Sequence, residues 1–234
     1  IQQVSNALSI ALLDLPEMIK DARKLSARRG SELLSLAEAK GAAASIAVTT
    51  SASMSPPALL SEAAGELARY FDIALVGLEQ ENPGTRQVAE GVIFGSGRPT
   101  ILMPSACTID KLDRIAIAWD GSRVASRAVA DAWRLMERAS EVIVVTVTDE
   151  KPLKDEGAGE RLASGLRESG VKASFKTIRS EKGPIGATLQ AYAAENADIL
   201  VMGGYGHSRL RDFVLGGATE GVLSDLKLPV MLSH

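Results

Sequence analysis

The chain has 234 residues and a formal net charge of −3, and 46% of its residues are apolar while only 4% are aromatic. This composition is typical of a soluble, aliphatic-rich α/β protein, and the length suffices for one large domain or two ordinary ones. The net negative charge gives no indication of the basic surface that binds nucleic acid, and no apolar run reaches the roughly 18 residues of a membrane span. The one cysteine, Cys107, excludes an internal disulfide and fits a reducing cytoplasm.

The first 106 residues alternate between helical and strand patterns. The predicted helices are residues 17–40, 57–70 and 85–94, and the predicted strands are residues 45–50, 72–77 and 99–103. This order predicts a parallel sheet whose opening strand–helix–strand is absent from the sequence. Because the first strand of a doubly wound sheet is usually central, we expect the chain to be a piece of a longer protein.

The second half shows a complete alternation of strands and helices. The predicted strands are residues 115–118, 142–147, 173–178, 198–202 and 229–232, and the predicted helices are residues 123–138, 160–169, 184–195 and 213–226. Five strands alternating with four helices predict right-handed crossovers and a parallel sheet that is covered on both faces.

The two halves share an internal repeat. The stretch DIALVG beginning at Asp72 recurs as DILVMG beginning at Asp198, and EGVI beginning at Glu90 recurs as EGVL beginning at Glu220. In both copies, a proline that opens an apolar run follows the glutamate by nine residues. A repeat of this size indicates two similar domains. They are an N-terminally incomplete, degenerate domain over residues 1–106 and a complete domain over residues 107–234.

The last predicted strand of each repeat is apolar and has no neighbour beyond it. Exposed strand edges of this kind invite pairing. We therefore expect residues 99–103 and 229–232 to pair antiparallel within one chain, which would make a pseudo-dimer. Further dimerisation of two chains stays open.

A glycine-punctuated loop follows the predicted strand 198–202. Residues 203–219 read GGYGHSRLRDFVLGGAT. Glycine lets the backbone approach an anion closely, and the N–H groups of such a turn and of a helix start then point at the negative charge. The layout predicts a phosphate-holding turn, so we expect the second repeat to bind a nucleotide.

Three motifs follow strands of the second repeat. They are Asp120-Gly-Ser122 after its first strand, Thr146-Val147 at the end of its second, and Gly203-x-x-Gly206 followed after nine residues by Gly216. In combination they resemble the universal stress protein (UspA-like) family, over residues 109–234 and more weakly over the first half. The resemblance implies two tandem repeats of a five-stranded, adenine nucleotide alpha hydrolase-like fold.

The resemblance also implies a ligand, which is ATP or another adenine nucleotide, with or without Mg²⁺. Asp120 matches a position beside the adenine or ribose, and Val147 matches one whose backbone reads the adenine edge. The loop that begins at Met202 matches the surroundings of the ribose and phosphates. The candidate binding residues are Asp120, Ser122, Val147, Met202, Gly203, Gly206, His207, Arg209, Gly216, Gly217, Ala218 and Thr219.

Two departures from the family pattern affect this prediction. ATP-binding members carry Ser or Thr where this chain has Gly217, and losing that hydroxyl would weaken binding by about 1.5–3 kcal/mol unless Thr219 compensates. In the first repeat, Arg86 takes the place of Gly216, and Glu79 and Glu81 would repel phosphate. We therefore interpret the first repeat as structural.

Other interpretations stay open at this point. Residues 203–217 can be a purely structural turn, which would make the protein a nucleotide-free scaffold, and Asp120 can serve as a helix cap. Ser208 has no visible histidine–acid partner, and no metal-ligand spacing exists. An ATP-pyrophosphatase-type ligase would need a serine-rich loop after strand 115–118, where Asp120-Gly-Ser122 stands. We therefore expect slow hydrolysis at most, with no catalytic residues assigned.

Overall fold

A computed structural model describes residues 2–105, 107, 109, 111–149, 155, 157–180, 183–204 and 217–234, with side chains from residue 16 onward. The chain divides into two compact units, residues 1–54 (unit 1) and residues 55–234 (unit 2). The predicted division into domains at residues 106 and 107 stays a prediction. Among the described residues, no helix is both long enough and apolar enough to cross a membrane.

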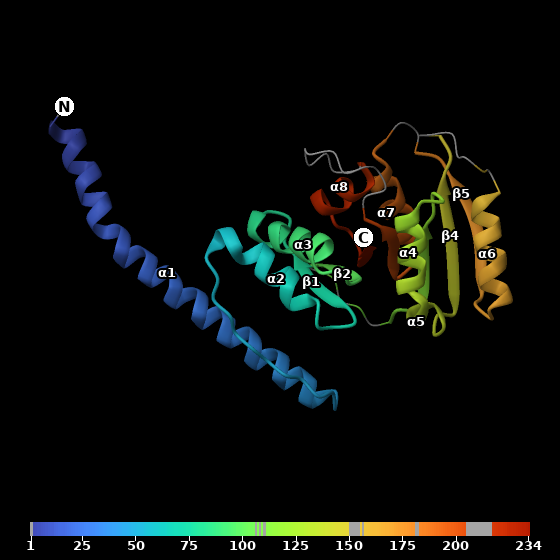
Figure 1. Cartoon of the computed structure of the whole chain (residues 1–234), viewed down its shortest axis with the longest axis horizontal. Coiled ribbons are helices and arrows are strands. Elements are labelled where there is room, and N and C mark those ends of the chain that lie inside the picture. The colour runs from blue at the N-terminus through green and yellow to red at the C-terminus, as the bar shows by residue number, and fades with distance from the viewer. Residues whose placement is uncertain are drawn as a thin grey trace. The chain divides into compact units, whose positions relative to one another are not determined.

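Unit 2 alternates strands and helices around one sheet (Figure 1). Its elements are η1 (Pro57–Leu59), α2 (Leu60–Ala68), β1 (Ala74–Leu78), α3 (Pro83–Gly95), β2 (Thr100–Pro104), β3 (Arg114–Ala118), α4 (Arg123–Asp131), α5 (Trp133–Met136), β4 (Glu141–Val147), α6 (Ala158–Glu168), β5 (Ala173–Ile178), α7 (Ile185–Asn196), β6 (Ile199–Gly203), α8 (Gly217–Ser224) and β7 (Val230–Ser233). The seven strands lie in the order β1-β2-β7-β6-β3-β4-β5. The predicted α/β class is confirmed.

Helices cover both faces of the sheet because successive side chains of a buried strand point to opposite sides. In β3, Ile115 and Ile117 pack in one cluster with α4, α5 and α6. Ala116, between them, packs in a second cluster with α3, α7 and α8. The central part of the sheet is therefore the middle layer of three, and central strands such as β3 and β6 are apolar on both faces.

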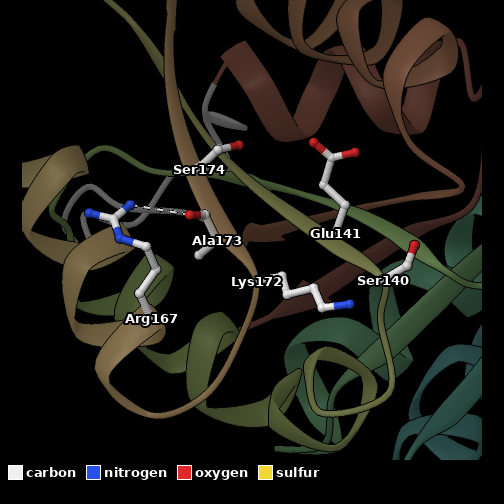
Figure 2. A pocket seen from close by; sticks show the side chains of 6 residues that line it. All are labelled: Ser140, Glu141, Arg167, Lys172, Ala173 and Ser174. Atoms are coloured by element: carbon white, nitrogen blue, oxygen red, sulfur yellow. Dashed lines mark hydrogen bonds between the residues drawn. The ribbon is translucent and has the colours of Figure 1, made fainter.

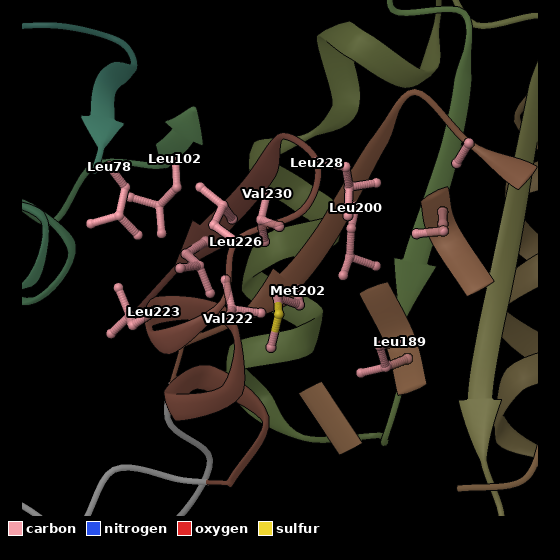
Figure 3. Close-up of a cluster of buried hydrophobic side chains, with 14 of the residues drawn as sticks. Leu78, Leu102, Leu189, Leu200, Met202, Val222, Leu223, Leu226, Leu228 and Val230 are labelled. Carbon is pink, nitrogen blue, oxygen red and sulfur yellow. The ribbon is translucent and has the colours of Figure 1, made fainter. Parts of the chain in front are cut away.

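The β2 and β7 strands pair antiparallel, as the sequence predicts. Thr100 lies opposite Leu232, and Leu102 lies opposite Val230. All other neighbouring strands are parallel. One cluster of buried side chains crosses this junction and includes Leu102 from β2 and Leu223 from α8 (Figure 3). The strands on the two sides of the junction therefore share a hydrophobic core.

The repeated glycine after each glutamate allows two helices to pack closely. A Cβ atom added to Gly91 of α3 would lie 2.3 Å from the carbonyl oxygen of Ser61 in α2. A Cβ added to Gly221 of α8 would lie 3.2 Å from Cα of Gly186 in α7. A larger residue at Gly91 would therefore push α2 and α3 apart, whereas one at Gly221 would require α7 to shift by only a few tenths of an ångström.

The aspartate of the second repeat fixes the start of β3. The Asp198 carboxylate accepts hydrogen bonds from the backbone amides of Asp113 and Arg114, both at 2.9 Å, and pairs with the Arg114 guanidinium at 2.9 Å. Burial acts to raise the pKa of Asp198, but these donors outweigh it and hold the pKa below its usual value. The contribution of this carboxylate to stability is therefore complete above the usual aspartate pKa of 3.8, and it is lost as the pH falls through the lowered pKa.

Two predicted helices differ in extent from the observed ones. The predicted helix 123–138 is divided at Ala132, where ψ of −1° departs from the helical value. The predicted helix 213–226 is described only as α8, because residues 213–216 lie outside the described residues. The β5 strand has the predicted bounds, and the other elements shift by a few residues, as helix ends commonly do.

Unit 1 consists of α1 (Gln2–Ala43) and a segment without helix or strand that extends to residue 54. The predicted helix 17–40 is confirmed and is longer than expected. The predicted strand 45–50 is wrong, and Ile46 is 64% exposed. A strand needs a hydrogen-bonded neighbour. Its counterpart β5 pairs with β4, and the described residues before β1 contain no strand that could play the part of β4.

Candidate functional site

The described residues of the three family-like motifs lie at one edge of the sheet. The β6, β3 and β4 strands are adjacent and parallel, so Gly203, Asp120 and Val147 all lie at or just beyond carboxyl ends. The amide of Trp119 donates to the Val145 carbonyl at 2.8 Å, which ties the turn after β3 to β4. Open α/β sheets bind their ligands at this edge.

The turn after β3 gives Asp120 and Ser122 different roles. Ser122 is the N-cap of α4, since its Oγ accepts a hydrogen bond from the Ala125 amide at 3.2 Å. The carboxylate of Asp120 accepts a hydrogen bond from the Ser122 amide at 2.9 Å, and Asp120 is otherwise exposed. Ser122, and not Asp120, is therefore the N-cap of α4. Contact of Asp120 with a ligand, the other role considered for it, stays a prediction.

Gly203 has a packing role that the sequence did not reveal. A Cβ atom at this position would lie 2.6 Å from the carbonyl carbon of Val124 and 2.7 Å from the amide nitrogen of Ala125. Both atoms belong to the backbone of α4, which cannot rotate away as a side chain can. The missing side chain therefore lets the first turn of α4 approach the end of β6.

A row of half-buried apolar side chains follows the carboxyl ends of β3, β4 and β5. Ala118, Val147 and Ile178 point to the same face, and Ile185 at the start of α7 joins them. Each packs on the buried cluster below while keeping part of its surface exposed. We call these four residues the apolar rim. Sequence reasoning found only Val147, although the alternation along the strands could have indicated Ala118 and Ile178.

The remaining candidates divide between exposed and buried positions. Gly217, the first residue of α8, is exposed, and a Cβ added there would meet no described residue within 4 Å. Ala218 is half-buried, whereas Thr219 is 2% exposed and Met202 is 3% exposed. The buried position of Thr219 leaves little surface with which its hydroxyl could compensate for Gly217.

Four candidates fall outside the part of the chain that the structure describes. They are Gly206, His207, Arg209 and Gly216. Among the residues that are described, no group of three or more His, Cys, Asp or Glu side chains is placed to hold a metal ion.

Comparison with known proteins places these features in a family. The family model of the universal stress protein family matches residues 111–234, more than half of the chain. The chain belongs to the universal stress protein family. A universal stress protein of Synechocystis sp. is 25% identical over 211 residues, which cover 85% of this chain and 70% of that relative. The crystal structure of a universal stress protein from Archaeoglobus fulgidus covers 88% of this chain and 76% of its own, with 20% identity and a TM-score of 0.67, so it shows the same fold.

This universal stress protein carries an ion-pair network between α3 and α8. Arg86 donates from Nε to Glu90 at 2.9 Å and from Nη2 to Glu220 at 2.8 Å. The hydrogen bond from Arg86, together with one from Ser224, lowers the pKa of Glu220, and the bonds to both glutamates raise the pKa of Arg86. Arg86 therefore links α3 to the first turn of α8, and this partner could not be inferred from sequence alone because it is 134 residues away.

An open depression of about 440 Å³ lies at the opposite edge of the sheet (Figure 2). It is lined by Ser140, Glu141, Arg167, Lys172, Ala173 and Ser174, around the amino ends of β4 and β5. Arg167 donates to the carbonyl of Ala173 at 3.1 Å and to Glu160 at 2.6 Å. The guanidinium thus joins α6 to β5, and the depression is separate from the edge that carries the family motifs.

Proposed function

We propose that this universal stress protein binds an adenine nucleotide at the carboxyl edge of β3, β4 and β6 and acts as a nucleotide-responsive module of the stress response. The observation that carries the proposal is the presence, at one sheet edge, of the apolar rim and the turn that holds Asp120. Such an edge offers the two surfaces that a nucleoside requires: an apolar wall for the base and polar groups for the sugar.

The adenine ring would lie against the apolar rim. The side chains of the apolar rim are partly exposed, and each is held in place by packing on the buried cluster beneath it; they are Ala118, Val147, Ile178 and Ile185. A flat ring placed there would remove their remaining apolar surface from water, and the backbone of Val147 is the candidate source of hydrogen bonds to the edge of the ring. Asp120, exposed beside them, is a candidate acceptor for the ribose hydroxyls.

The phosphates would be held by the backbone that leads into α8. A helix start carries unsatisfied N–H groups and partial positive charge, and Gly217 has no side chain, so among the described residues nothing lies within 4 Å of its Cβ position. Glu220 in the first turn would oppose an anion, but its carboxylate is paired with Arg86. Gly206 and Gly216 complete this part of the proposal by their match to the family pattern, and His207 and Arg209 are further candidate contacts to phosphate in the same loop of the sequence.

The chemistry proposed for the site is binding, with slow hydrolysis at most. Hydrolysis would need a side chain that removes a proton from water, and none of the candidate binding residues in the described part of the chain is assigned that role. A nucleotide-free scaffold is the second candidate function, and the β2–β7 junction favours it, because this pairing joins the strands on its two sides into one sheet.

The first experiment asks whether nucleotide is bound at all. Purified protein is denatured and the released small molecules are identified by mass spectrometry. Equilibrium binding of ATP, AMP and adenosine then separates the contribution of the base from that of the phosphates. Failure to saturate with any of the three up to millimolar concentration would favour the scaffold.

The second experiment locates the site. Val147→Glu places a charge in the apolar rim and should weaken ATP binding by about tenfold or more, whereas Lys172→Gln makes the same change in net charge at the opposite edge and should leave binding unchanged. Gly206→Val should abolish binding by blocking the approach of the backbone to phosphate. Equal weakening by the variants at Val147 and Lys172 would place the nucleotide elsewhere.

A further inference from the structure

The edge strand β1 of unit 2 is open on one side. Among the described residues its hydrogen-bonded neighbour is β2 alone. The amide of Ala74 donates to the Pro99 carbonyl at 3.0 Å, so the peptide groups of Ala74 face β2. Because these groups alternate along a strand, those of Leu75 and Gly77 face the open side and are able to pair with another strand.

The sequence repeat provides an internal comparison, because β1 corresponds to β6. The Leu200 amide makes the equivalent bond to the Pro229 carbonyl, also at 3.0 Å. On its other side, however, β6 pairs with β3, where Val201 lies opposite Ile117 and α4 packs over β6. Val201 is therefore 0% exposed, whereas Leu75 at the same position of the first repeat is 65% exposed.

The helix side of this edge shows the same difference. In the second repeat, α7 packs against β6, β3 and β4, and its Ala193 and the following Ala197 are 0% and 6% exposed. The corresponding residues of the first repeat, Leu67 of α2 and the following Phe71, are 53% and 56% exposed. Within unit 2, no described strand lies where β3 would lie, so these large apolar side chains remain uncovered.

Asp72 adds a polar group to the edge. Its counterpart Asp198 holds the start of β3 by accepting the amides of Asp113 and Arg114 and by pairing with the Arg114 guanidinium. Asp72 is exposed and has no hydrogen bond or ion pair with any described residue of unit 2. Its carboxylate is therefore free to receive two strand amides and a basic side chain.

We propose that Leu67, Phe71, Asp72 and Leu75, which we call the β1 edge site, dock a strand–helix segment of polypeptide with the chemistry of β3 and α4. The segment begins with a basic residue that pairs with Asp72. Alternating aliphatic residues follow, and they pair parallel with β1 beneath α2. An amphipathic helix with a small-residue face comes next and covers Leu75, as α4 covers Val201.

The β1 edge of a second copy of this chain would not supply the basic residue and the covering helix that the proposed segment has. Two β1 strands related by a twofold axis would pair antiparallel. Asp72, before the strand, would then lie near Glu79 and Glu81, which follow it. Like charges placed opposite each other destabilise a strand pair, and the pairing would still supply no helix to cover Leu75.

The test uses the full chain and a synthetic peptide with the sequence of residues 111–138, which carries β3, α4 and α5. Amide hydrogen exchange is followed by NMR with and without millimolar peptide. We expect exchange at Leu75 and Gly77 to slow by about tenfold or more, because these amides gain hydrogen-bonded partners. The amides of Val76 and Leu78 already face β2 and should change little.

Variants decide whether the peptide binds in the proposed way. Leu75→Lys should remove the protection, whereas Leu59→Lys, at a leucine that is 51% exposed outside the β1 edge site, should retain it. Asp72→Asn, or a peptide in which Arg114 is replaced by Asp, should raise the Kd by about tenfold. Absence of protection at saturating peptide, or protection that survives Leu75→Lys, would overturn the proposal. Protection of the same amides without peptide, together with a dimer in sedimentation, would overturn it in favour of a second copy.

Discussion

Replacing Gly203 by alanine tests how closely α4 must approach β6. The added Cβ would lie 2.6 Å from the backbone of Val124, which is 0.8 Å short of an ordinary contact of 3.4 Å. Since α4 also packs against β7, the helix can move only by disturbing a second strand. Overpacking of this kind costs about 1–3 kcal/mol, so we expect the free energy of unfolding to fall by that amount.

The assay is equilibrium unfolding in urea, with Gly217→Ala as the matched control. Gly217 opens a helix, and no described residue lies within 4 Å of its Cβ position, so alanine there should change stability by about 0.5 kcal/mol or less. The midpoint should fall for the variant at Gly203 while the m-value is unchanged. A variant at Gly203 that is as stable as the wild type, or a control that loses as much, would refute the packing argument.

Three further predictions concern single side chains. Gly217→Ser introduces the hydroxyl that the family resemblance implies at this position, and on the proposed function it should tighten ATP binding by about tenfold in calorimetry. Asp198→Asn should lower the free energy of unfolding by about 1–3 kcal/mol, because the Arg114 guanidinium loses its partner. The difference in free energy of unfolding between variant and wild type should shrink as the pH falls below the usual aspartate pKa of 3.8. Arg86→Met should cost about 0.5–1 kcal/mol, since the pair with Glu220 is partly exposed, and should raise the pKa of Glu220 in an NMR titration.

The order of elements was predictable because it depends on local periodicity. Strand β5 was predicted at its observed bounds, since its flanking residues mark both ends, and the β2–β7 pairing followed from two apolar edges. The strand predicted at residues 45–50 was wrong, because strand formation also depends on a neighbour, and the described residues before β1 supply none. The break at Ala132 carries no sequence signal that we can identify.

The candidate site was predictable in position but not in detail. The motif spacing located Asp120 and Val147 at one sheet edge, since strand order follows from the fold class. The packing role of Gly203 and the link from Arg86 to Glu220 depend on contacts between distant segments, which periodicity does not encode. The individual binding contacts stay predictions.

The antiparallel meeting of β2 with β7 also limits how the protein can be dissected. A fragment cut at the repeat boundary would expose the edge of β7 and strip Leu102 from the cluster that it shares with Val230. Such a fragment would carry an exposed, largely apolar edge strand, which favours aggregation. The two repeats should therefore melt together in a single calorimetric transition, and a soluble half-protein would need a lysine or a proline introduced on that border.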